Sequence, residues 1–362
     1  MKRNRWCAGM LAAAMVISLC GCGGGGEGDT TTTASTAPTT TTTTGTPTTF
    51  EAAADSTLKI SSPNGKRPSA ETVERLASIC KAYRGTLSVY YKDLETGYTL
   101  TYDAGRNFQA ASVIKAPYVK WLLTKGVDGN EKLTLREKKG GSSFIDEKPI
   151  GTEFTVDELM EYAIRYSDNS AYNMLNARFG FGEFNTYADT LGVSANRDNN
   201  CVLVNPRPQF GYLSAQDIGL YFEDIAKFVE TGTPEAKDLF SWLVTTTEQA
   251  QLPDAFAGRK QYMMKDTNGN AQSEGYDDGN VTFLDTPEAV NLAYESRKQG
   301  YTIGHKYGEQ GNQAYHDGAI VWRDRPYVLA ITSTLPPYER ESIRIFHDIA
   351  MLVDQLQTDW YN

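Results

Sequence analysis

Three short groups of polar residues carry the side chains that could do chemistry in this sequence. Ser112-Val113-Ile114-Lys115 places a hydroxyl and an amine three residues apart. Ser167-Asp168-Asn169 supplies a second hydroxyl, and Lys306-Tyr307-Gly308 supplies a second lysine beside a glycine. A serine whose proton is taken by a nearby lysine can attack a carbonyl group and form a covalent acyl intermediate. Together the three groups indicate an acyl-transferring serine enzyme that works without a histidine.

The Ser-x-x-Lys spacing alone is a weak signal, because it occurs at Ser56–Lys59, at Ser78–Lys81 and at Ser112–Lys115. Ser78 falls inside an amphipathic helix, whereas Ser112 opens a segment that is apolar on most sides. At the start of a helix, unpaired backbone N–H groups and the positive end of the helix dipole stabilise an oxyanion. This context favours Ser112 as the nucleophile and Lys115 as its base. The alternative is that Ser112 only caps the helix.

The tripeptide Ser167-Asp168-Asn169 lies between two expected helices, Thr155–Arg165 and Ser170–Arg178. One interpretation is a turn that caps the second helix. The functional interpretation gives Ser167 the transfer of a proton to a leaving nitrogen and Asn169 a hydrogen bond to a substrate amide. Asp168 is expected to brace the turn rather than contact substrate.

Lys306-Tyr307-Gly308 follows a short predicted strand. A lysine aimed into a cleft from this strand would hold a substrate carboxylate, and its charge would help to keep Lys115 neutral. Gly308 would let a ligand approach the strand closely. The alternative is a solvated turn, since Lys-x-Gly is a common pattern.

Two predicted hairpins lie at opposite ends of the chain. Their strands are Thr86–Tyr91 with Tyr98–Tyr102, and Tyr315–Trp322 with Tyr327–Thr334. A helix is expected to open after Ser69, and Glu339–Gln357 has helical spacing. We therefore expect an α+β fold, an α/β sandwich in which the N- and C-terminal segments form one antiparallel sheet with the terminal helices packed on it.

The middle of the chain has a different periodicity. Most segments from about 111 to 250 repeat every 3.6 residues, which predicts an inserted all-helical subdomain. Residues from about 254 to 299 are polar and rich in Gly, Asn and Asp, which predicts a long surface insertion that is either functional or disordered. A ligand is expected between the sheet and the helical subdomain.

The first 57 residues carry targeting features. Residues 1–21 combine three basic residues with an apolar stretch too short to span a membrane, which predicts a signal peptide. Leu19-Cys20-Gly21-Cys22 resembles the lipobox of bacterial lipoproteins, which implies lipidation of Cys22; an ordinary secretory signal is the alternative. Residues 22–57 are Gly- and Thr-rich and are expected to form a disordered tether before a domain at 58–362.

These features predict an exported lipoprotein, held at the outer face of the cytoplasmic membrane or in the cell envelope through Cys22. The net charge of −10 argues against a nucleic-acid partner. No cofactor or metal site is implied, because the three histidines lack ligand spacing. Cys80 and Cys201 are expected to be buried thiols, with a disulfide as the alternative. We expect a monomer.

The order of the three groups resembles the class A β-lactamase-like family of penicillin-recognising serine hydrolases over about residues 60–360. The resemblance implies an acyl-enzyme mechanism on a β-lactam or peptidoglycan-derived ligand. It implies these roles: Ser112 as nucleophile, Lys115 as general base, Ser167 as proton shuttle, Asn169 as substrate contact, Lys306 as carboxylate anchor, and the backbone N–H groups of Ser112 and Glu309 as the oxyanion hole.

Three features depart from the family pattern. No glutamate lies between Phe184 and Phe222, where the family carries the glutamate that activates water, and Asn205 stands in the corresponding stretch. An amide can position a water molecule but cannot deprotonate it. Tyr307 replaces a small hydroxyl residue, and Glu309 places a negative charge beside the expected anion site.

The sequence therefore predicts a β-lactam-opening serine hydrolase whose acyl-enzyme is released slowly. Two alternatives stay open. One is a D,D-peptidase or transpeptidase that acts on peptidoglycan peptides. The other is a cell-wall binding or sensing domain without catalysis, which Tyr307 and Glu309 suggest.

Overall fold

The computed structural model describes residues 48–52, 55, 57–140, 144–193, 211–248, 250–256, 261–263, 281–283 and 286–361. The chain divides into two units, 1–43 and 44–362, and all the described residues belong to the second. None of the described helices is long and apolar enough to cross a membrane.

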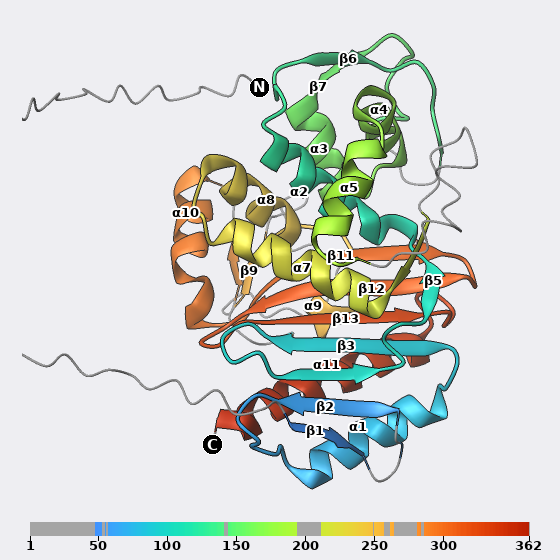
Figure 1. Ribbon diagram of the computed structural model, residues 1–362. Helices are drawn as coiled ribbons and strands as arrows, with labels where there is room; N and C mark the ends of the chain where they lie inside the picture. The colour runs from blue at the N-terminus through green and yellow to red at the C-terminus, as the bar shows by residue number, and fades with distance from the viewer. Residues whose placement is uncertain are drawn as a thin grey trace, which may run out of the picture. The chain divides into compact units, whose positions relative to one another are not determined.

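A seven-stranded sheet forms the centre of the second unit, and every neighbouring pair of its strands is antiparallel (Figure 1). The central strands come from both ends of the domain, which confirms the predicted α+β fold and the predicted sheet. In spatial order the strands are β1 (Thr48–Glu51), β2 (Leu58–Ser62), β4 (Thr99–Tyr102), β3 (Leu87–Asp93), β13 (Tyr327–Ser333), β12 (Ala314–Trp322) and β11 (Thr302–Gln310).

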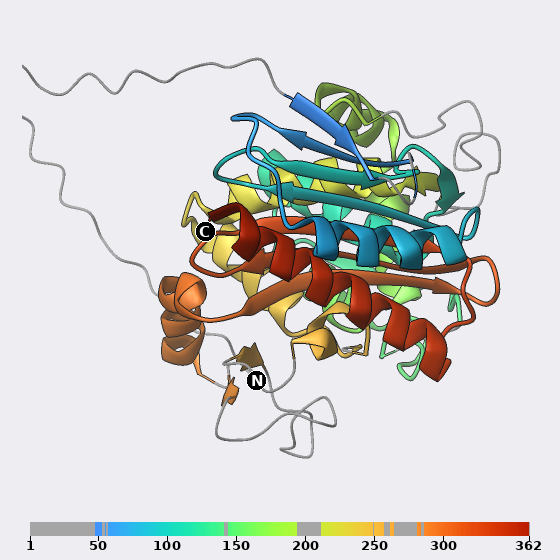
Figure 2. The same cartoon turned by 90° about the horizontal axis from the view of Figure 1, so that it is seen from below.

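Helices cover both faces of this sheet, which explains why β12 and β13 are buried along their whole length. The terminal helices α1 (Ala70–Ala82) and α11 (Arg340–Tyr361) lie side by side on one face (Figure 2). The opposite face packs against α7 (Ala215–Val229). Glycine permits this close contact, because a Cβ atom at Gly219 would lie 2.1 Å from the Tyr90 ring.

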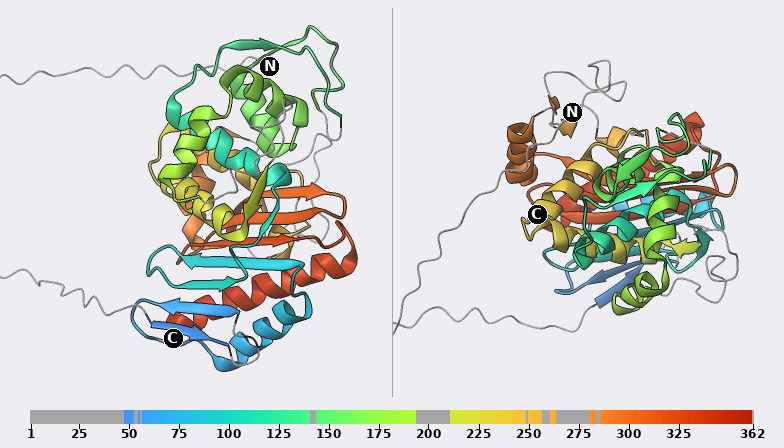
Figure 3. Two further views of the ribbon diagram at one scale, coloured as in Figure 1. Left: turned by 45° about the vertical axis from the view of Figure 1, so that its right-hand side comes forward. Right: turned by 90° about the horizontal axis from the view of Figure 1, so that it is seen from above.

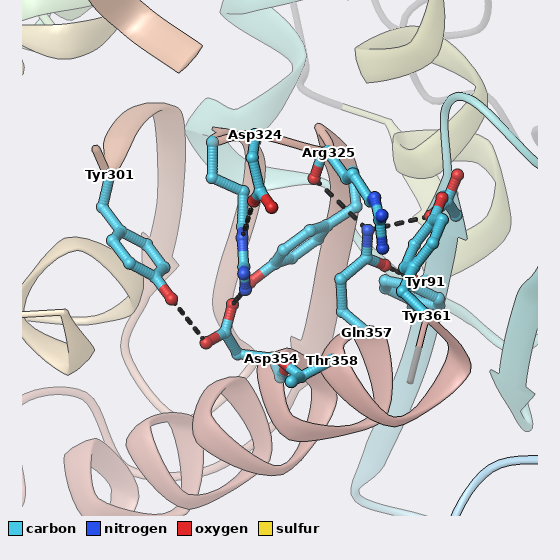
Figure 4. A network of polar contacts seen from close by, with 11 residues as sticks. Tyr91, Tyr301, Asp324, Arg325, Asp354, Gln357, Thr358 and Tyr361 are labelled. Carbon is cyan, nitrogen blue, oxygen red and sulfur yellow. Dashed lines mark hydrogen bonds and ion pairs between the residues drawn. The ribbon is translucent and has the colours of Figure 1, made fainter. Parts of the chain in front are cut away.

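A network of polar side chains ties α11 to the sheet (Figure 4). Asp354 accepts hydrogen bonds from the Tyr301 hydroxyl at 2.8 Å and from Arg323 Nη1 at 2.7 Å. One turn further on, Gln357 Nε2 donates to Asp93 at 2.8 Å. Buried polar groups need such partners. The network therefore fixes the register of α11 on the sheet.

The helical subdomain gathers at the β11 end of the sheet (Figure 3). Besides α7, its members are α2 (Lys115–Lys125), α3 (Val156–Arg165), α4 (Asn169–Phe179), α5 (Gly182–Thr190) and α8 (Pro234–Val244). Two of its helices begin at capping boxes: α3 at Thr155, where the sequence predicts a helix start, and α7 at Ser214.

Three short strand pairs and several short helices complete the described structure. The pairs are β5 (Asn107–Gln109) with β8 (Tyr212–Ser214), β6 (Lys132–Thr134) with β7 (Glu153–Thr155), and β9 (Gln261–Met263) with β10 (Val281–Phe283). The helices are η1 (Ala111–Ile114), α9 (Leu252–Ala255), α10 (Pro287–Ser296) and η3 (Arg297–Gln299).

Two segments predicted from the sequence contain regular structure that the sequence did not predict. Strand β1 falls inside the segment 22–57 that we expected to be a tether, because it pairs with β2 at the edge of the sheet. Helix α10 falls inside the polar segment 254–299, where Pro287 and the Thr286 cap start a helix that packs on α8. Cys80 is a buried thiol with its pKa raised by burial to about 12, and Cys201 lies outside the described residues.

Candidate active site

Ser112 and Lys115 lie at the junction between the short helix η1 and α2. Ser112 is half-buried, and Lys115 is completely buried. The preceding residue, Ala111, has a φ of +47°, a left-handed conformation that is unusual for a residue with a Cβ atom. Such backbone strain, about 1–3 kcal/mol, concentrates at functional sites. The chain therefore holds Ser112 in a conformation that local preference alone would not select.

The Lys115 amine lies among three oxygen atoms. It is 2.5 Å from the Ser167 carbonyl oxygen, 2.7 Å from Asn169 Oδ1 and 3.3 Å from Ser167 Oγ. Carbonyl oxygens can only accept, whereas a hydroxyl can also donate. A neutral amine satisfies both carbonyl groups with its two hydrogens and keeps its lone pair for a hydroxyl. The geometry thus suits an uncharged lysine that acts as a base.

The pKa of Lys115 is lowered well below its usual value. Burial is the largest cause, repulsion from Lys306 is the second, and attraction from Asp168 opposes both. Burial has the larger effect because a charged amine loses its hydration in the interior, and the repulsion from Lys306 that the sequence predicts adds to it.

The Ser167-Asp168-Asn169 turn is held by its middle residue. The Asp168 carboxylate accepts from Ala171 N at 2.8 Å, which caps α4, and from Ile145 N at 2.9 Å. Asp168 thus braces the turn, as expected. Ser167 has a φ of +52°, so a second strained residue faces Lys115. Asn169 donates to the Gly140 carbonyl at 3.2 Å and accepts from Lys115, and its contact with a substrate stays a prediction.

Lys306 comes from the middle of β11 and is completely buried. Its Nζ donates to the Tyr307 carbonyl at 3.1 Å and lies 3.7 Å from the centre of the Tyr307 ring. Burial lowers the pKa of Lys306 to about 7, against the opposing attraction of Asp317 and Glu248. Burial also raises the pKa of Tyr307 to about 12, while a hydrogen bond with the Ser167 side chain acts in the opposite direction. Tyr307 thus connects the lysine strand to the serine turn.

Gly308 brings β11 against the backbone of the nucleophile. A Cβ atom at this position would lie 2.9 Å from the Ala110 carbonyl oxygen, 3.0 Å from Val113 N and 3.2 Å from Ser112 N. This approach places the Ser112 N–H beside the strand that carries Glu309. The backbone N–H groups of Ser112 and Glu309 are the two groups expected to bind an oxyanion.

Gly308→Ala should therefore slow acylation of Ser112 by about 10- to 100-fold, because β11 must move away from η1 and the oxyanion donors separate. The rate of labelling by a fluorescent penicillin measures the effect. Gly105→Ala is the matched control, since a Cβ atom there meets nothing within 4 Å. A Gly308→Ala rate within twofold of the wild type would contradict the prediction.

Several polar residues behind Lys306 were not predicted from the sequence. His305 Nδ1 lies 2.9 Å from Asp317 Oδ1, and His305 Nε2 contacts the Thr246 hydroxyl. Glu248 acts on Lys306, and burial raises the pKa of the Glu248 carboxyl. No spacing in the sequence connects these residues, because they come from the segment that follows α8 and from two paired strands. The only sequence signal for these residues was the alternation of side chains along β12, whose pairing with β11 places Asp317 opposite Tyr307.

The structure brings most of the predicted site residues to one place, where η1, the start of α4 and β11 meet. Ser112, Lys115, Ser167, Asn169 and the segment Lys306–Glu309 all belong to this region. The predicted water-positioning residue Asn205 and the predicted lipidation site Cys22 lie outside the described residues.

A fold of this type, with a half-buried serine followed three residues later by a buried lysine at the sheet–helix junction, defines the class of penicillin-recognising serine proteins. The model of the β-lactamase enzyme family matches residues 70–356, and the chain belongs to this family.

Curated relatives agree with this assignment. A β-lactamase of Bacillus licheniformis is 25% identical over 291 residues, which are 78% of this chain and 82% of that protein. The β-lactamase ROB-1 of Haemophilus influenzae is 34% identical over 110 residues, which are 30% of this chain and 36% of that protein. The chain thus matches only about a third of the length of this second relative.

Solved structures share the fold. PBP-A has a TM-score of 0.58 and 21% identity, and the match covers 81% of this chain and 98% of that one. A variant of PBP-A with the same values was solved as an acyl-enzyme complex with penicillin G. A class A β-lactamase from Mycobacterium abscessus has a TM-score of 0.54 and 18% identity, and the match covers 79% of this chain and 98% of that one.

Proposed function

We propose that this protein is a serine hydrolase that opens β-lactam amides by acylation of Ser112 and releases the product slowly. The observation that carries the proposal is the burial of Lys115, whose amine lies among two carbonyl oxygens and a hydroxyl with a strongly lowered pKa. An uncharged lysine one turn from a serine is the equipment that nucleophilic attack requires.

The proposed acylation follows from the roles of these groups. Lys115 takes the proton of Ser112 as its oxygen attacks the lactam carbonyl carbon. The backbone N–H groups of Ser112 and Glu309 bind the oxyanion that forms. When the C–N bond breaks, Ser167 passes a proton to the leaving nitrogen, and this proton is replaced from Lys115.

Release of the acyl group needs an activated water molecule. Between Phe184 and Phe222 the sequence has no glutamate, and Asn205 in the corresponding stretch cannot act as a base. We therefore infer that hydrolysis of the acyl-enzyme is the slow step. The same absence favours the second candidate, a D,D-peptidase or transpeptidase. Release of D-alanine from a peptidoglycan peptide faster than hydrolysis of any β-lactam would favour that candidate.

The cellular location of the protein is a proposal that rests on the sequence. A lipid on Cys22 would hold the domain at the outer face of the cytoplasmic membrane. The motif Leu19-Cys20-Gly21-Cys22 supports this proposal. Fatty-acid labelling that persists in Cys22→Ala would contradict it.

The test of the activity is a time course of intact mass after addition of penicillin G. We expect one added penicillin per chain, mapped by peptide digestion to Ser112, that persists far longer than it takes to form. Rapid turnover without an accumulated adduct would contradict slow release. An unmodified protein with no turnover would contradict the proposed activity.

A further inference from the structure

A hollow lies at one end of the central sheet, beside β5 (Figure 1). At this end of the sheet β3 begins, β13 ends and β11 turns into β12. The volume of the hollow is about 440 Å³, which is within the size range of small-ligand sites. The polar residues that line it are Arg106, Asn107, Gln109, Tyr212, Gln313 and Thr334. We call it the β5 hollow, and none of these residues belongs to the serine–lysine site.

The β5–β8 strand pair presents one polar face to this hollow. Gln109 lies directly opposite Tyr212 in the antiparallel register, and Asn107 lies two residues before Gln109 on the same strand. Residues that lie opposite one another or two positions apart share a face of the pair. Phe108 belongs to the other face, where it is buried against His316. The face toward the hollow therefore combines two carboxamide groups with one tyrosine ring.

The side chains of Tyr212 and Gln109 are available to a ligand. Tyr212 is 39% exposed. The Gln109 carbonyl oxygen accepts a hydrogen bond from His316 Nε2 at 2.8 Å, whereas Gln109 Oε1 is shielded from solvent and has no hydrogen-bond partner in the described part of the chain. A buried acceptor normally has a partner. Because a terminal amide has a broad torsional preference, this group can turn toward a donor on a ligand.

The net charge of the lining is small. Arg106 is the charged side chain among the described lining residues, and its Nε already donates to Asp103 at 2.6 Å. A ligand with several phosphate groups would need uncompensated cations, and a cationic ligand would need carboxylates. Amide and hydroxyl groups instead form neutral hydrogen bonds in which each amide both donates and accepts. The lining therefore suits a neutral ligand that is rich in hydroxyl and amide groups.

We propose that the β5 hollow binds an N-acetylated saccharide, with a sugar ring stacked on Tyr212 and its acetamido and hydroxyl groups hydrogen-bonded to Asn107 and Gln109. The face of a sugar ring consists of C–H groups and can pack on an aromatic ring, whereas its rim carries hydroxyl groups. An acetamido group has one N–H donor and one carbonyl acceptor, and a carboxamide side chain can pair with both. This inference goes beyond the proposed acylation of Ser112 and does not depend on it.

The β5 hollow lies close to the expected nucleophile. Strand β5 ends at Gln109, and Ser112 follows three residues later in η1. Consecutive Cα atoms lie about 3.8 Å apart, so the Cα atoms of Gln109 and Ser112 are within about 11 Å of each other. The segment between them is held by a hydrogen bond from Ala110 N to the Gly211 carbonyl at 2.9 Å. A ligand that joins a saccharide to an acyl group therefore needs only a short spacer to reach both places.

Calorimetric titration of the full chain with N,N′,N″-triacetylchitotriose tests the proposal, and maltotriose is the matched trisaccharide without acetamido groups. We expect a dissociation constant of about 1 mM or lower for triacetylchitotriose, and at least about tenfold weaker binding of maltotriose. Tyr212→Ala should weaken the binding of triacetylchitotriose about tenfold, whereas Tyr212→Phe retains the ring and should bind within about twofold of the wild type. Gln109→Ala should weaken binding about fivefold, the size typical of one hydrogen bond. Tyr212 is exposed, so its variants are expected to fold, and thermal unfolding checks this.

Absence of binding to the wild type at about ten times that concentration would overturn the inference. Equal or tighter binding of maltotriose would overturn the preference for an N-acetylated ligand. Triacetylchitotriose binding that is unchanged in both Tyr212→Ala and Gln109→Ala would place the saccharide elsewhere and would also overturn the inference. The same titration with Ser112→Ala should give the wild-type dissociation constant. Failure of penicillin G to modify the wild type would therefore contradict the proposed activity and leave this inference standing.

Discussion

Replacement of Ser112 by alanine should abolish covalent modification by penicillin G. Without the hydroxyl no oxygen atom of residue 112 can form the ester. A water molecule bound in its place would not be oriented for attack as the Ser112 hydroxyl is at the start of the helix. Turnover of any acyl substrate should fall by at least about 10³-fold. Reversible binding should persist, because Ser112 is only half-buried and alanine fits its place. Intact mass and equilibrium binding measure the two outcomes separately.

Ser78→Ala is a control with the same sequence pattern. Ser78 also has a lysine three residues later, but it is exposed on α1, and its hydroxyl donates to the Glu74 carbonyl at 2.8 Å. Labelling of Ser78→Ala should equal that of the wild type. A persistent adduct in Ser112→Ala, or a lost one in Ser78→Ala, would assign the chemistry to the wrong serine.

The sequence predicts the sheet and several helix starts well because short-range rules govern them. The two terminal hairpins appear as β3–β4 and β12–β13. Thr155 and Ser214 form capping boxes because the acidic residue three positions later reaches back to the cap N–H. These elements carry the candidate site, which is why the three polar groups could be expected to meet.

Long-range contacts explain what the sequence could not predict. Strand β1 lies in a Thr-rich stretch and forms because it pairs with β2 at the edge of the sheet. The contact of Asn169 with Lys115 joins residues 54 positions apart. Glu248 acts electrostatically on Lys306 because it follows α8, which packs against β11. In each case the partner is fixed by packing of the whole domain, which no local pattern records.

Backbone strain at the site is also invisible in the sequence. Ala111 and Ser167 both adopt positive φ, at +47° and +52°, although glycine or asparagine would be the usual choice. Each lies in the turn that precedes a helix of the site. Packing must impose this conformation and thereby fix the distance between the Ser167 hydroxyl and Lys115. A rigid site of this kind orients its groups before a substrate arrives.

Lys115→Met should slow acylation of Ser112 by about 10³-fold, within the range typical for loss of a general base. Methionine has a similar length and fits the buried position, but it cannot accept a proton. Lys115→Arg places a permanent positive charge at this position and removes the base, because a guanidinium stays protonated at all accessible pH values. We therefore expect Arg to be as inactive as Met. A rate within tenfold of the wild type for either variant would show that another group takes the Ser112 proton.

The pH dependence separates this role from a merely structural one. The pKa of Lys115 is lowered in the fold, so the neutral amine is present above that pKa and is lost as the pH falls through it. Lys306, whose pKa is about 7, also becomes charged as the pH falls. Its charge lowers the pKa of Lys115 further. Acylation by the wild type should thus fall towards acid pH, whereas the residual rate of Lys115→Met should lose that slope. A slope that survives in Lys115→Met would assign the titration to Lys306 or Asp168 instead, and the buried amine would then be a structural group that holds the Ser167 turn.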